Sequence, residues 1–106
     1  MTRSMLGIDF GTTNTLCAWI ENGKPQMIPN DRGSRTTPSV VALSHSGEIL
    51  VGESAKNQAV ASPQMTLAGI KRRLGSRSPL SLGGRSIAPE EAASWIFAKV
   101  KRDAES

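Results

Sequence analysis

The sequence has few aromatic residues and only one cysteine. Two tryptophans, two phenylalanines and no tyrosine occur in 106 residues, so the core must be built mainly from aliphatic side chains. Cys17 has no partner for an internal disulfide and lies within a strand-like pattern, where we expect it to be a small buried apolar residue. A lone buried cysteine is typical of a reducing compartment, and we therefore expect a cytoplasmic protein.

Long hydrophobic runs are also missing. No stretch approaches the ~20 apolar residues of a membrane helix, and Asp9 interrupts the N-terminal segment where a signal peptide needs an apolar run. The net charge of +4 includes the cluster "KRRLGSRS", but no aromatic residue is interleaved there for base stacking. We expect neither a membrane nor a nucleic-acid partner, and a solvated basic helix end explains the cluster.

The pattern of strands begins at once with "GIDFGTTNT". Apolar residues alternate with small or polar ones from Leu6 to Phe10, and in "TLCAWI" the residues Leu16, Ala18 and Ile20 share one face. Asn22-Gly23 is a strong hairpin signal, which predicts a three-stranded antiparallel meander up to about residue 28.

Short strands and two helices are predicted next. After the loop "PNDRGSRTTPS", the runs "VVAL" and "ILVG" read as strands on either side of a turn, and "ESAKNQAVA" reads as a helix. A second helix is predicted between Pro63 and Leu74, with Leu67 and Ile70 on its apolar stripe and Gly75 as its stop.

The last segment has the pattern of an amphipathic helix, after a short strand around 85–87. Pro89 suits its first turn, and Glu90 and Glu91 suit the helix dipole. Its apolar stripe consists of Ala93, Ile96, Phe97, Val100 and Ala104. Because no helix stop follows, we expect the opening piece of a longer protein, with this stripe packed on later strands that the chain lacks. Alone, such a fragment is expected to self-associate or to fray at this helix.

The tip of the first hairpin could bind a ligand. Gly11 lets the backbone approach closely, and Thr12, Thr13 and Asn14 offer hydroxyls, an amide and N–H groups to phosphate oxygens. Asp9 would repel a phosphate unless a cation such as magnesium lies between them. The tip therefore suits a magnesium nucleotide, although an ordinary hairpin with a polar turn explains this motif equally well.

Longer stretches resemble one family. "IDFGTTNT", "IPNDRGSRTTPSVVA" and "GEILVGESAKNQAVASPQMTLAGIKRRLG" are similar to the seventy-kilodalton heat-shock chaperones, the DnaK-like family. The resemblance runs from Met5 to Gly75 and more loosely from Gly83 to Glu105. "RTTPS" and "IKRRLG" are specific to that family, whereas the hairpin motif is shared with actin and with sugar kinases.

The resemblance implies an α/β fold, the first lobe of an actin-like, ribonuclease-H-like ATPase. The part present would be a three-stranded meander, a small α+β subdomain and a C-terminal helix. Residues 1–38 would hold the first strands with the phosphate loop, 39–88 the peripheral subdomain, and 89–106 the start of the return helix.

The resemblance also assigns roles at the nucleotide. Asp9 corresponds to a carboxylate that orients magnesium through water, and Gly11, Thr12, Thr13 and Asn14 correspond to the first phosphate loop.

Downstream residues complete this assignment. Lys71 corresponds to the catalytic lysine, which reaches the γ-phosphate and the attacking water, and Arg72 to an arginine near the nucleotide. Arg35 and Pro38 belong to the "RTTPS" loop, for which packing within the lobe is expected.

The implied function is that of the N-terminal segment of a chaperone ATP-binding domain. ATP or ADP with Mg²⁺ would be the cofactors, and hydrolysis in the full protein would control peptide binding in protein folding and the stress response. Unfolded peptides, a J-domain co-chaperone and a nucleotide-exchange factor would be the partners. Because the second phosphate loop and the adenosine pocket are absent, we expect the isolated chain to be inactive. The alternatives are a fragment of a sugar-kinase-type phosphotransferase and a truncated, non-enzymatic interaction module.

Overall fold

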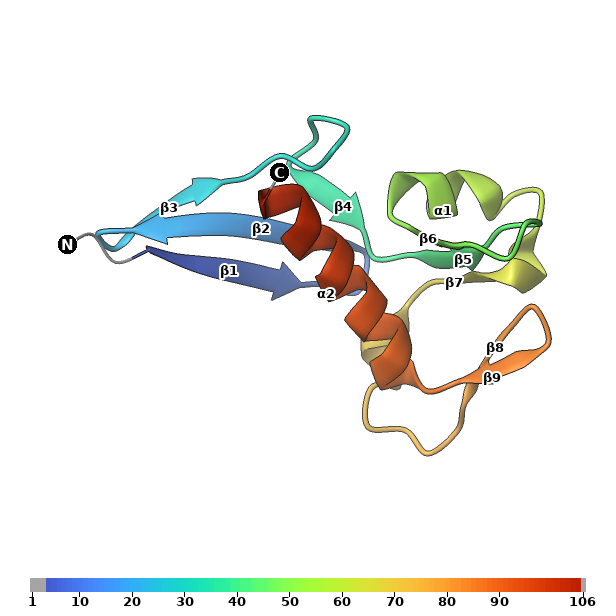
Figure 1. The fold of residues 1–106 in the computed structure, drawn as a ribbon. Helices are drawn as coiled ribbons and strands as arrows, with labels where there is room; N and C mark the ends of the chain where they lie inside the picture. Colours follow the sequence, from blue (N-terminus) through green and yellow to red (C-terminus); the bar gives the residue numbers. More distant parts are fainter. Residues whose placement is uncertain (1–3, 106) are drawn as a thin grey trace.

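The first part of the chain is an antiparallel sheet arranged around one long central strand. The computed structural model describes residues 4–105 (Figure 1). The sheet comprises β1 (Ser4–Phe10), β2 (Asn14–Glu21), β3 (Lys24–Met27) and β4 (Thr36–Pro38). β2 pairs with β1 along one edge, and its other edge pairs with β3 and then with β4. The predicted meander is confirmed, including its turn, where Asn22 and Gly23 have positive φ angles of 53° and 76°.

A second, smaller sheet and a separate hairpin follow. β5 (Val41–Leu43) lies between β6 (Ile49–Val51) and β7 (Thr66–Leu67), and α1 (Glu53–Gln58) packs on this sheet. The hairpin consists of β8 (Leu80–Leu82) and β9 (Arg85–Ile87), and it leads into α2 (Pro89–Glu105). β5, β6, β9 and both of these helices agree with the sequence patterns, whereas β7 and β8 are strands that these patterns do not predict.

The helix predicted between Pro63 and Leu74 is wrong. This segment forms two short 3₁₀ turns, η1 (Pro63–Met65) and η2 (Ile70–Arg73), with β7 between them. Pairing of β7 with Val41 and Ala42 requires an extended backbone, and Gly69 takes a left-handed conformation with φ 66°. Because the strand partner lies far away in the sequence, helical spacing alone could not reveal it.

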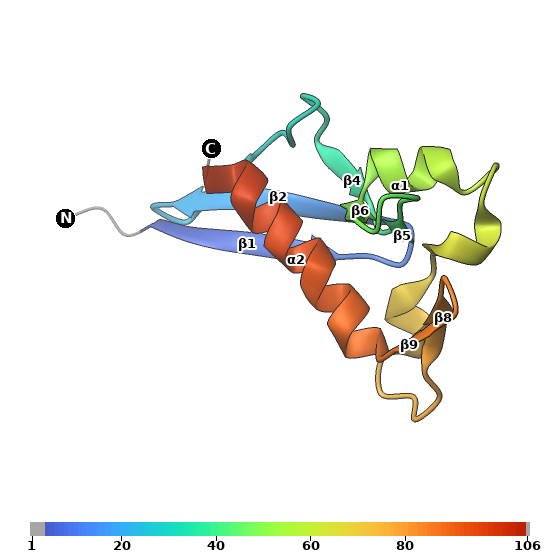
Figure 2. The ribbon, with the colours of Figure 1, turned by 45° about the vertical axis from the view of Figure 1, so that its right-hand side comes forward.

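The face of the sheet that α2 covers carries most of the core. Figures 1 and 2 both show α2 lying across β1 and β2. Its buried residues are Pro89, Ala92, Ala93, Ile96 and Val100. The expectation that this stripe needs later strands is wrong, because β1, β2 and the β8–β9 hairpin already supply its apolar partners. These partners include Leu6, Ile8, Cys17, Leu80, Leu82 and Ile87.

The two faces of the β1–β2 hairpin differ. Cys17 lies opposite Ile8 on the side of α2 and is buried, as expected, and burial raises the pKa of its thiol. Leu16 and Ala18 share a face as predicted, but it is the opposite face, together with Asp9. Within residues 4–105, no helix is both long and apolar enough to cross a membrane.

Candidate functional site

The tip of the β1–β2 hairpin is a tight loop that only glycine can begin. The N–H of Gly11 donates to the carbonyl oxygen of Asn14 across 3.0 Å. A Cβ atom at Gly11 would lie 2.4 Å from that same oxygen, far inside van der Waals contact. The sequence therefore needs a glycine here so that the loop closes and presents Thr12 and Thr13 at its tip.

Ser39, which directly follows β4, contacts this loop through its side chain and its backbone. Its hydroxyl donates to the carbonyl oxygen of Gly11 at 2.8 Å, and its N–H donates to the carbonyl oxygen of Thr13 at 2.9 Å. Its Oγ also lies 2.9 Å from Oγ1 of the buried Thr15. The end of the "RTTPS" stretch thus fixes the hairpin tip through the hydrogen bonds of Ser39.

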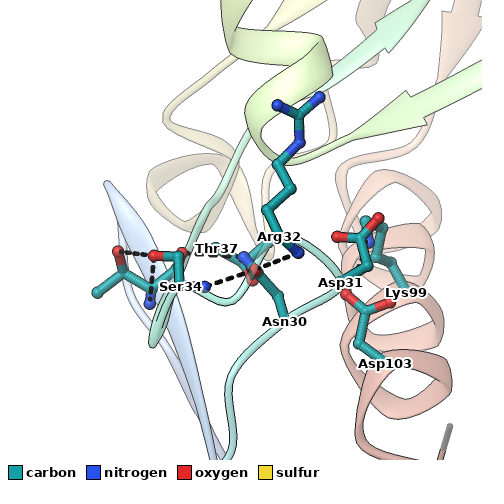
Figure 3. Close-up of polar contacts among 8 residues, drawn as sticks. Asn30, Asp31, Arg32, Ser34, Thr37, Lys99 and Asp103 are labelled. Atoms are coloured by element: carbon teal, nitrogen blue, oxygen red, sulfur yellow. Dashed lines mark hydrogen bonds and ion pairs between the residues drawn. The ribbon is translucent and has the colours of Figure 1, made fainter.

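The loop that leads into β4 is shaped by one side chain (Figure 3). Oδ1 of Asn30 accepts the N–H groups of Arg32 and Ser34, while its Nδ2 donates to the carbonyl oxygen of Thr36 and to Oγ1 of Thr37. These four hydrogen bonds fold residues 30–37 into one turn. They place β4, and hence Ser39, beside the hairpin tip.

A cleft of about 320 Å³ opens between the hairpin tip and the small sheet. Its walls come from the hairpin tip, the end of β4, α1 and the segment around η2. The lining residues are Thr12, Thr13, Asn14, Pro38, Ser39, Val40, Lys56, Ala59, Thr66, Ala68, Gly69 and Arg72. This volume lies within the range of small-molecule sites.

Two exposed cations line this cleft, and no carboxylate is among its lining residues. Lys56 comes from α1 and Arg72 from η2. Within residues 4–105 neither forms a salt bridge. Together with the hydroxyls of Thr12 and Thr13, they form a donor set suited to a polyanion such as a chain of phosphates.

The other predicted site residues lie elsewhere or at the rim. Lys71 is exposed on η2 beside Arg72, but in the described part of the chain it does not line the cleft. Asp9 is exposed and lines a separate hollow of about 310 Å³ on the sheet face opposite α2, beside Gly7, Leu16 and Ala18. The structure thus brings the phosphate loop and Arg72 together, and it leaves Lys71 and Asp9 outside that cleft.

A magnesium ion could find only one predicted ligand here. Across residues 4–105, no three side chains of the histidine, cysteine, aspartate or glutamate types lie close enough to hold a metal. The lone carboxylate of Asp9 fits a role through a bound water and not a full protein cage.

Sequence reasoning missed Lys56 and Ser39. Lys56 occurs in a run of helix formers, where a lysine is normally solvated, and the cleft it faces forms only when α1 and the hairpin meet. Ser39 occurs in the quoted "RTTPS", yet its contact with Gly11 spans 28 positions. The family-specific motif was the only signal for it.

The geometry first defines a class of site: a glycine-dependent hairpin tip beside two cations that form no salt bridge among residues 4–105, which is suited to binding phosphates. Comparison with protein families then gives the particular relationship. Residues 5–82 match the family described as Hsp70 protein. The chain therefore belongs to the Hsp70 family, and the suspected DnaK-like relationship is confirmed.

Proposed function

We propose that this chain forms one wall of the ATP-binding cleft in the ATPase domain of a DnaK-like chaperone. The observation that carries this proposal is the cleft in which Thr12 and Thr13 lie beside Lys56 and Arg72, and whose lining in the described part of the chain includes no carboxylate. Membership of the Hsp70 family supports nucleotide binding as the function of such a cleft. In this proposal the loop and the two cations hold the phosphates of ATP or ADP.

The finer roles follow from the family resemblance. Asp9 would hold Mg²⁺ through a bound water, and the ion would supply charge neutralisation at the phosphates. Lys71 acts on the γ-phosphate and the attacking water once the missing side of the cleft has closed over η2. The fold completes to an actin-like lobe in a longer cytoplasmic protein, where ATP hydrolysis controls peptide binding. A J-domain co-chaperone and a nucleotide-exchange factor act on that protein.

The sugar-kinase alternative has less support. The hairpin tip fits both classes, but the match to the Hsp70 family extends over residues 5–82, well beyond the tip. The "RTTPS" stretch also contacts the tip, because Ser39 donates hydrogen bonds to two of its carbonyl oxygens. A non-enzymatic interaction module remains the outcome if the cleft binds no phosphate.

Titration of the ¹⁵N-labelled chain with Mg-ADP, inorganic pyrophosphate and adenosine tests the proposal. We expect amide shifts of Thr12, Thr13 and Asn14 with Mg-ADP and pyrophosphate, and none at these residues with adenosine. Binding should be weak, because one wall supplies few of the contacts of a complete site. Absence of loop shifts at millimolar Mg-ADP and pyrophosphate would overturn the proposal.

A further inference from the structure

Ser39 is a buried polar residue whose hydrogen bonds all go to the hairpin tip or its base. The residue is 1% exposed, and its hydroxyl donates to the carbonyl oxygen of Gly11 while its N–H donates to that of Thr13. Since a serine hydroxyl has one proton, and Gly11 receives it, the 2.9 Å contact with Thr15 must use the Thr15 proton. The order of donation is therefore Thr15 to Ser39 to Gly11.

We propose that Ser39 is a positioning residue for the phosphate-binding tip, an inference that rests on the proposed function. Its two donors occupy the carbonyl oxygens of Gly11 and Thr13, on either side of Thr12. Left bare, these oxygens would place negative dipole ends next to a phosphate. Because both carbonyl oxygens accept hydrogen bonds from Ser39, the groups of the tip that can contact an anion are its N–H groups and hydroxyls.

The arrangement also fixes the tip before a ligand arrives. Gly11 is held at its N–H by Asn14 and at its carbonyl by Ser39, so the peptide groups on both sides of its Cα are fixed. A loop ordered in advance loses less entropy on binding, which strengthens affinity without any direct contact. Ser39 therefore acts through Gly11 and Thr13, whether or not it touches the ligand itself.

Replacement of one hydroxyl at a time separates positioning from mere stability. Ser39→Ala removes the donor to Gly11, whereas Thr15→Val keeps the shape, removes the other hydroxyl of the same chain of bonds and leaves the Ser39–Gly11 bond in place. We expect Ser39→Ala to weaken pyrophosphate binding about tenfold, the range for an unsatisfied buried group. Thr15→Val should bind within about twofold of the parent chain.

A second measurement needs no ligand. Hydrogen exchange of the Gly11 amide should speed up about tenfold in Ser39→Ala relative to that of the core residue Ile96, and it should not do so in Thr15→Val. Because the amide of the buried Ile96 reports on global unfolding, a faster Gly11 amide without an equal rise at Ile96 indicates local opening of the tip.

The two readouts separate the possible failures. If the parent chain does not bind pyrophosphate, the proposed function fails, while the exchange ratio still decides whether Ser39 fixes the tip. Equal exchange ratios in the two variants would overturn the positioning role. The positioning role would also be overturned if Ser39→Ala and Thr15→Val had equal melting temperatures and lost equal affinity for pyrophosphate.

Discussion

Lys99 of α2 joins the helix to the loop before β4, because its Nζ lies 3.1 Å from Oδ1 of Asp31 (Figure 3). The same ammonium group lies 2.6 Å from Oδ2 of Asp103, one helical turn further on. Asp31 directly follows Asn30, the residue that shapes the loop leading to Ser39. The C-terminal helix therefore contacts the segment that supports the tip of the β1–β2 hairpin.

This ion pair predicts a pH-dependent contribution to stability. Partial burial lowers the pKa of Lys99, but its hydrogen bonds to Asp103 and Asp31 and their charges outweigh this effect, so the pKa is raised. Because the pKa of Lys99 is higher in the folded than in the unfolded state, its charge stabilises the folded state. This stabilisation is complete at pH values below the unfolded-state pKa of about 10.4, and it is lost as the pH rises through the folded-state pKa. Lys99→Met should cost about 0.5–1 kcal/mol of unfolding free energy at pH 7, because Asp31 is largely exposed.

Denaturant unfolding of the parent chain and of Lys99→Met between pH 7 and pH 11.5 measures this effect. The difference between them should stay constant to about pH 10 and shrink above it. Lys101→Met, a change at an exposed lysine of the same helix, is the control. A difference that grows above pH 10 would contradict the assigned direction of the pKa shift.

Gly11→Ala tests the geometry of the tip. The added Cβ would lie 2.4 Å from the carbonyl oxygen of Asn14, so the loop must open and its phosphate contacts should be lost. Gly7→Ala on β1, the strand that leads to the tip, is the matched control, since the nearest atom to its Cβ would be the flexible end of Ile20 at 3.2 Å. Amide shifts with pyrophosphate should disappear in the first variant and persist in the second. Retained binding in Gly11→Ala would show that the tip is not the site.

The hairpins that β1, β2 and β3 form, and the β5–β6 hairpin, were predictable because their signals are local. Asn22-Gly23 specifies its own turn, and strand alternation is visible within a few residues on each side. The segment 63–74 was not predictable, since its backbone depends on a partner strand more than twenty positions earlier. Lys56 and Ser39 join the site for the same reason: their neighbours in space are distant in the sequence.

The internal packing of α2 predicts unequal costs along its apolar stripe. Ile96 is 0% exposed, so Ile96→Ala should cost about 2–5 kcal/mol, and an unfolded variant would meet this expectation. Phe97 is 37% exposed and has its ring 5.2 Å from that of Phe10, so Phe97→Ala should cost less. Denaturant titration measures both free energies. Equal and small losses, with rapid amide exchange throughout 89–105, would mean that the helix is not packed on the sheet.

Self-association of the chain remains a prediction, and the edge of the first sheet is its expected cause. In the described residues, β1 pairs with β2 on one edge only, and an unpaired edge can pair with another chain. Light scattering over a concentration series should show that the average molecular mass grows with concentration. Ile8→Lys is not a suitable variant to test this, because Ile8 packs in the core. A lysine in place of the exposed Met5 should reduce the association, because charge on an edge strand disfavours pairing. A chain that stays monomeric at millimolar concentration would rule this out.

Lys71 and Arg72 are neighbours with different positions relative to the cleft. In a protein that carries the rest of an Hsp70 ATPase domain, Lys71→Ala should reduce hydrolysis about 10²- to 10³-fold and leave nucleotide affinity nearly unchanged, as for other transition-state donors. Arg72 lines the cleft, so Arg72→Ala should weaken binding of ADP and ATP alike. The isolated 106-residue chain should hydrolyse ATP at or near the background rate in either case, because phosphoryl transfer needs groups from both walls.

Equilibrium binding and single-turnover hydrolysis, measured on the same preparations, separate these roles. Arg73→Ala is the matched control, because it removes a neighbouring cation of η2 that does not line the cleft in the described chain. If Lys71→Ala loses affinity as much as turnover, Lys71 binds the ground state and its assignment to the γ-phosphate is wrong. If Arg73→Ala weakens nucleotide binding as much as Arg72→Ala does, the effect comes from the overall positive charge of η2. The position of Arg72 in the cleft then has no special role.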